Sequence, residues 1–173
     1  VRRENRRRAE EGRPLLEPLY EWDDVDRTLE ATRGHRYGEW IEVVPGLQAR
    51  FHDAGHILGS AVVEVCLQTD AGATTLVFSG DLGQYDSPIL RDPQTPEQAD
   101  LVLMESTYGD RGHKDLARSL AELGEVLDRA RHAGGNVLIP AFAVGRSQEI
   151  LYYLGKHYDD WQLARWQIFL DSP

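Results

Sequence analysis

The chain has 173 residues, of which 41% are hydrophobic and 28% charged, so it can bury the core of one domain or slightly more. Its net charge of −10 argues against a generic nucleic-acid-coating protein, but not against a nucleic-acid enzyme whose cleft is made positive by bound metal. The single cysteine, Cys66, excludes an intramolecular disulfide and a cysteine-rich zinc site, and it fits a cytoplasmic location. No apolar run could span a bilayer and no signal-peptide pattern opens the sequence, so no membrane partner is expected.

The first part of the sequence predicts an exposed helix or frayed end, a short helix, and then a β-rich region whose last two strands form a hairpin. Residues 1–13 combine six arginines with three glutamates and almost no apolar residues. This composition is typical of a solvated helix or a frayed end, which we favour over a phosphate-contacting patch. A short helix is expected to begin at Asp23 as its N-cap. Alternating or turn-bounded runs then predict strands at 38–44, 47–51, 61–68 and 74–78.

The strand at 61–68 is apolar on one face, whereas its other face mixes Val62 and Cys66 with Glu64 and Gln68. That pattern is typical of a half-buried strand.

From about Gly109 the sequence changes to alternating strands and helices. Residues 84–99 hold three prolines and predict a loop, and residues 100–104 are apolar enough for a buried strand. A parallel sheet covered by helices is the expected result. The remaining predicted elements are a helix from Asp115 to Gly134, a buried strand at 136–140, a helix at 146–158 with Ile150, Leu151 and Leu154 inward, and a strand at 167–170.

Three predicted strand ends carry side chains that suit metal chemistry. His56 lies on a glycine-flanked loop, Asp81 follows a Ser-Gly bend, and Glu105 ends an apolar strand. We expect these ends to converge on one metal-centred site, because imidazole and carboxylate are common metal ligands and a carboxylate can bridge two cations.

Each of these residues also has a simpler structural interpretation. Most single histidines are surface or structural groups, Asp81 could cap a turn, and Glu105 could contact Thr107 or Tyr108. Glu105 could instead orient a catalytic histidine and tune its pKa.

Two further charged side chains are weaker candidates. Arg146 could meet a phosphate at a helix N-terminus, but pairing with Glu149 is the stronger interpretation. His52 is expected to have a structural or supporting role. Because the Walker A, Gly-x-Gly-x-x-Gly, Gly-x-Ser-x-Gly and His-Glu-x-x-His sequences do not occur, phosphate-loop NTPases, serine hydrolases and zincins are disfavoured.

Four motifs together resemble the β-CASP branch of the metallo-β-lactamase superfamily, which includes ribonuclease J and the pre-mRNA 3′-end endonuclease. The motifs are Asp-Ala-Gly-His-Ile-Leu-Gly-Ser at 53–60, Ser-Gly-Asp-Leu-Gly at 79–83, Glu-Ser-Thr-Tyr-Gly-Asp-Arg at 105–111 and Ile-Pro-Ala-Phe-Ala-Val-Gly-Arg-Ser-Gln-Glu at 139–149. The resemblance implies an α/β fold: a partial metallo-β-lactamase αββα sandwich over 1–109, then the start of a parallel-sheet β-CASP domain over 110–173.

The resemblance also implies a role for each matched residue. His56 corresponds to a metal ligand and Asp81 to the carboxylate that bridges two zinc ions. Glu105 corresponds to an acidic residue that supports a later histidine. The implied activity is zinc-dependent hydrolysis of RNA phosphodiesters. RNA is the expected partner, and single-stranded DNA and a second copy of the chain are left open.

The chain departs from the family pattern at both ends. It lacks the His-x-His-x-Asp-His motif that supplies most zinc ligands, and it lacks the later histidine motifs. It also begins at Val1 instead of methionine. We therefore expect a fragment of a nuclease that, alone, binds metal poorly and cleaves nothing. The alternatives are a metallo-β-lactamase-fold hydrolase of small esters or thioesters, and a non-catalytic scaffold in an RNA-processing complex.

Overall fold

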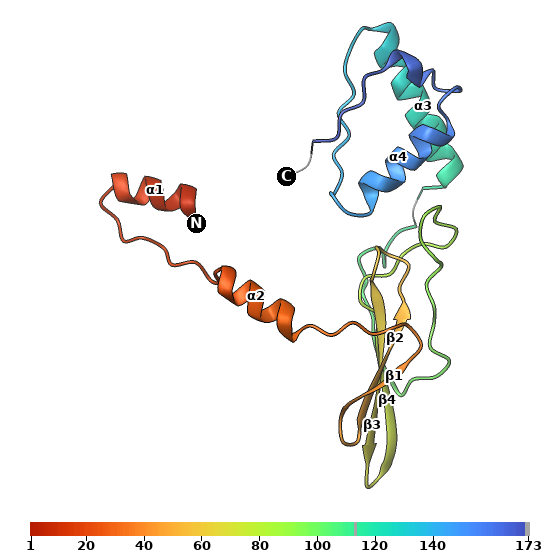
Figure 1. Ribbon diagram of the computed structural model, residues 1–173. Helices are drawn as coiled ribbons and strands as arrows, with labels where there is room; N and C mark the ends of the chain where they lie inside the picture. Colours follow the sequence, from red (N-terminus) through yellow and green to blue (C-terminus); the bar gives the residue numbers. More distant parts are fainter. Residues whose placement is uncertain (113, 172–173) are drawn as a thin grey trace. The chain divides into compact units, whose positions relative to one another are not determined.

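A computed structural model describes residues 1–112 and 114–171 of the chain (Figure 1). It divides into two compact units, Val1–His35 and a second unit that begins at Arg36. Within the described residues the second unit contains the whole sheet and the longer helices. No helix in the described part of the chain is both long and apolar enough to cross a membrane.

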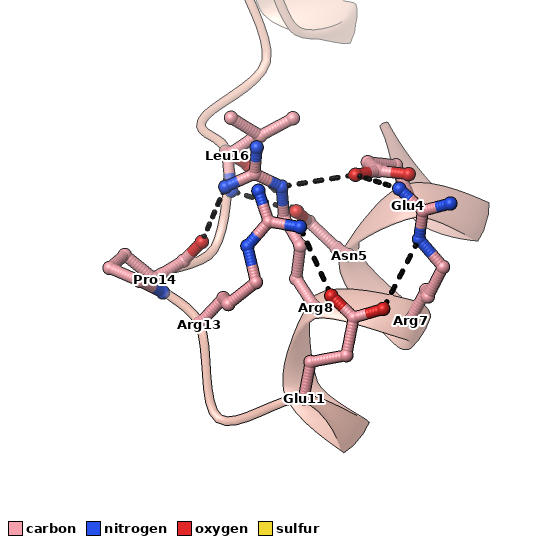
Figure 2. A network of polar contacts seen from close by, with 8 residues as sticks. All are labelled: Glu4, Asn5, Arg7, Arg8, Glu11, Arg13, Pro14 and Leu16. Carbon is pink, nitrogen blue, oxygen red and sulfur yellow. Dashed lines mark hydrogen bonds and ion pairs between the residues drawn. The ribbon is translucent and has the colours of Figure 1, made fainter.

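The first unit contains helices α1 (Arg2–Glu10) and α2 (Trp22–Ala31), and neither helix buries a residue. Figure 2 shows that acidic side chains neutralise several arginines of the N-terminal segment: Arg7 and Arg8 lie 3.0 and 3.2 Å from Glu4. Arg13 pairs with Glu11 at 3.0 Å. The predicted solvated helix is therefore confirmed.

The N-cap of α2 is Glu21, two residues before the predicted N-cap Asp23. The backbone amide of Glu21 donates to the Asp24 carboxylate at 2.9 Å, which stabilises the earlier start.

The sheet of the second unit has five strands in the order β1-β2-β3-β4-β5. The first four are consecutive antiparallel neighbours, whereas β5 pairs with β4 in parallel. All four predicted strands are thus confirmed, as is the hairpin formed by β3 and β4. The strands are β1 (Trp40–Val44), β2 (Leu47–Asp53), β3 (Ala61–Thr69), β4 (Gly72–Phe78) and β5 (Leu101–Leu103).

Strand β3 buries its mixed face rather than its apolar face: Val62 and Glu64 are buried, whereas the neighbouring apolar positions are only half-buried. Glu64 lies opposite Arg50 of β2. Its carboxylate accepts from Arg50 at 2.8 and 3.0 Å and contacts the His52 Nε2 atom at 2.6 Å. The Arg50 guanidinium also stacks 4.5 Å from the centre of the Trp40 ring. This contact agrees with the structural or supporting role expected for His52.

The Glu64 cluster predicts a loss of local stability in acid. Burial alone would raise the pKa of Glu64, but hydrogen bonds from His52 and Arg50 outweigh it and lower the pKa. The Glu64 carboxylate therefore stabilises the fold fully above its unfolded-state pKa of about 4.3. This stabilisation disappears as the pH falls through the lower pKa that Glu64 has in the folded state. Native-state hydrogen exchange of β2 and β3 amides, corrected for intrinsic rates, should show this loss. In Glu64→Gln the acid-dependent loss should shrink, whereas Glu42→Gln, at an exposed β1 position, should retain it.

Helices α3 (Leu116–His132) and α4 (Arg146–Lys156) form a hydrophobic core with the short 3-10 helix Leu163–Arg165. Asp115 caps α3 by accepting from the Arg118 amide at 3.0 Å, and Gly134, with a φ of 64°, follows the helix end. Both ends of α3 agree with the prediction. The core residues are Leu127, Leu154 and Leu163, with Trp161 and Trp166 packed against them.

Helix α4 differs from its prediction in length and in its buried face. It ends at Lys156 rather than 158, and Leu151 is 42% exposed while Tyr153 is buried.

Two predicted strands do not form in the described structure, at 136–140 and 167–170. Leu138 is 92% exposed and Phe169 is 83% exposed. A strand needs a hydrogen-bonding neighbour, and no described segment pairs with either run. The strand predicted at 100–104 forms as β5, but the expected burial is wrong. Its residues are about half exposed, and among the described residues β5 is an edge strand that pairs with β4 alone.

Candidate metal centre

His56 lies on a tight loop between β2 and β3. The Asp53 carboxylate accepts from the Gly55 amide at 2.9 Å, and Gly55 takes a left-handed φ of 63°. The Ser60 hydroxyl oxygen accepts from the amides of His56 and Ile57 at 3.1 and 3.2 Å. The loop backbone is therefore fixed, while the His56 side chain stays 43% exposed.

Asp81 lies on the segment that leaves β4. The Ser79 amide donates to the Leu103 carbonyl at 2.9 Å, and Gly80 turns the chain with a φ of 57°. The Asp81 carboxylate is 76% exposed, and its Oδ2 atom lies 3.9 Å from the His56 Nε2 atom. Two side chains that are 25 positions apart in the sequence thus face one another, as expected from the strand ends.

Glu105 follows β5 and contacts the segment that carries Asp81. Its Oε1 atom accepts from the Leu82 amide at 2.9 Å, and its Oε2 atom accepts from the Thr107 amide at 3.3 Å. Hydrogen bonds from the Thr107 hydroxyl and from the Leu82 and Thr107 amides lower the pKa of Glu105, so it is a carboxylate at neutral pH. The predicted contact with Thr107 is confirmed; a role in supporting a catalytic histidine stays a prediction.

The three predicted site residues line one broad cavity of about 1330 Å³, which also contains Arg146. Arg146 pairs with Glu149 at 2.7 Å, as predicted.

The donor atoms suit zinc, which binds histidine nitrogen and aspartate oxygen. However, the described residues contain no cluster of three or more histidine, cysteine, aspartate or glutamate side chains that could hold a metal. His56 and Asp81 offer donor atoms of the kinds that zinc binds, and their role as metal ligands stays a prediction.

Sequence reasoning missed the residues that hold these two loops together. Ser79 and Gly83 bring no metal-binding atom, and their importance is visible only in the contacts of their backbone and hydroxyl groups. The one available signal was the pair of glycines, Gly80 and Gly83, that flank Asp81.

No family model matches the chain, but it is similar to several known proteins. It is 45% identical over 157 residues to "Ribonuclease TTHA0252" of Thermus thermophilus, covering 91% of this chain and 35% of the relative. It is 36% identical to "Transcription termination factor FttA" of Thermococcus kodakarensis, covering 82% of this chain and 22% of the relative. It is 31% identical to an "RNase J-like protein" of Methanocaldococcus jannaschii, covering 91% of this chain and 37% of the relative.

The chain therefore spans about a third or less of the length of these relatives. Together with the four sequence motifs, these relatives show that the chain belongs to the β-CASP branch of the metallo-β-lactamase superfamily.

Proposed function

We propose that the full-length protein containing this chain is a metal-dependent ribonuclease. The observation that carries the proposal is the 3.9 Å approach of His56 Nε2 to Asp81 Oδ2 across two loops that are distant in sequence. The names of the relatives support RNA as the substrate. The finer architecture, a partial sandwich over 1–109 and the start of a β-CASP domain over 110–173, belongs to the same proposal.

Each site residue has a defined part in this proposal. The His56 imidazole and the Asp81 carboxylate would help to hold the zinc. Bound zinc supplies a Lewis acid and lowers the pKa of water for attack on a phosphodiester. Glu105 orients the Asp81 segment through the Leu82 amide and would support a histidine from another part of the protein.

The two alternative functions have less support. A non-catalytic scaffold would not require His56 and Asp81 to face one another. An esterase or thioesterase is not suggested by the names of these relatives. Single-stranded DNA as a substrate and a homodimer stay predictions.

An activity screen with metal removal tests the proposal. Purified full-length protein should cleave a labelled single-stranded RNA, and dialysis against a chelator should lower the rate by at least about 10³-fold, because the metal contributes several kcal/mol. Added zinc should restore cleavage. A DNA of the same sequence and a thioester serve as comparison substrates. Thioester hydrolysis without RNA cleavage, or RNA cleavage that survives verified metal removal, would contradict the proposal.

A further inference from the structure

We propose that Gly83 is a positioning residue that sets the spacing between His56 and Asp81. The inference rests on the proposed function for the metal-binding roles of these two side chains. The spacing between the two backbone segments that carry His56 and Asp81 can be tested without substrate.

Gly83 lies directly against the His56 loop. Its amide donates to the Ala54 carbonyl at 2.8 Å. A Cβ atom at Gly83 would lie 1.7 Å from the Gly55 carbonyl oxygen and 2.7 Å from the His56 nitrogen. The backbone of Gly83 is not in the left-handed region, so space alone excludes a side chain here.

The His56 loop also packs closely against a third segment of backbone. A Cβ atom at Gly55 would lie 2.8 Å from the Arg91 carbonyl oxygen and 2.9 Å from the ring of Pro93. The adjacent Gln94 is tied to β2 through its amide, which donates to the Asp53 carbonyl at 2.8 Å. The His56 loop is therefore restrained by contacts other than the one with Gly83.

The Asp81 segment is also held in place by hydrogen bonds. Glu105 accepts from the Leu82 amide at 2.9 Å, and the Glu105 amide donates to the Ser79 hydroxyl oxygen at 3.0 Å. Ser79 is 6% exposed, and its hydroxyl donates to the Gly80 carbonyl at 2.6 Å. Because both loops are supported, separating their backbones at Gly83 must change the distance between His56 and Asp81.

Gly83→Ala in the full-length protein tests this spacing. The alanine Cβ must move from 1.7 Å to at least 3.0 Å from the Gly55 oxygen. Since a misplacement of about 1 Å can lower a rate by about 10²-fold, we expect kcat to fall by about that factor with KM unchanged. Zinc affinity should fall at least about tenfold, and the cobalt-substituted protein should show an altered absorption spectrum. Gly155→Ala is the matched control, because a Cβ atom there meets open space.

Ser79→Ala is the second variant, because it introduces no overlap and protects the test if Gly83→Ala does not fold. In metal-free protein it should speed hydrogen exchange at the Leu82 and Gly83 amides and weaken zinc binding in the same direction. Unchanged metal affinity and cobalt spectrum in a folded Gly83→Ala protein would overturn the proposal. So would unchanged exchange and affinity in Ser79→Ala. If wild-type protein binds zinc but cleaves no RNA, and Gly83→Ala still weakens binding, the proposed function fails while the positioning role stands.

Discussion

Replacing His56 with alanine or Asp81 with asparagine in the full-length protein should lower RNA cleavage by at least about 10³-fold. Each change removes a metal-binding group from the pair in which His56 Nε2 lies 3.9 Å from Asp81 Oδ2. The hydrogen bonds that hold the His56 loop use backbone atoms and other side chains. The fold should therefore survive. Single-turnover cleavage and metal content by mass spectrometry measure the two effects separately.

Matched controls exist for both substitutions. His35→Ala removes an exposed histidine in the first unit, and Asp70→Asn changes a carboxylate in the turn between β3 and β4. Both should cleave RNA at the wild-type rate. If either variant kept a wild-type metal content and more than about a tenth of the activity, the residue changed in that variant would not be a metal ligand.

Glu64→Ala should destabilise the sheet by about 3 kcal/mol, because it leaves Arg50 and His52 without their shared carboxylate. This loss lies at the low end of the range for breaking a buried ion pair, because the Arg50 side chain is 29% exposed and can bind water instead. Hydrogen exchange of β2 and β3 amides in the full-length protein measures the local free energy of opening.

The control for this effect is Glu42→Ala on β1, whose side chain is exposed. It should change local stability by less than about 0.5 kcal/mol. A loss below about 1 kcal/mol in Glu64→Ala would mean that water replaces the carboxylate at little cost and that the cluster is not a main support of the sheet.

Sequence patterns correctly predicted the helices and strands whose stabilising contacts join residues close together in the sequence. Helix α3 carries its own cap at Asp115, and the β3–β4 hairpin carries its own turn, so both were predictable. Residues 136–140 have the apolar composition of a strand, but composition does not supply a neighbouring backbone. Likewise, the burial of Glu64 depends on Arg50 across the sheet, which the alternation within β3 alone does not reveal.

The candidate site was predictable to a similar degree. His56 and Asp81 carry recognisable donor atoms, and strand ends are natural places for them, so their convergence could be predicted. Gly83 acts through the absence of a side chain and through one amide hydrogen bond to Ala54. Such close backbone packing leaves no distinct sequence signal beyond the glycine itself.

The hydrogen bond from the Gly83 amide to the Ala54 carbonyl has a consequence for how metal would be acquired. It joins His56 and Asp81 through contacts made by this chain alone, across a separation of 25 residues. Closing a flexible loop of that length costs about 3 kcal/mol of chain entropy. This loss of entropy occurs when the chain folds. An incoming cation would therefore encounter His56 and Asp81 as a preorganised pair of ligands instead of two independent ones.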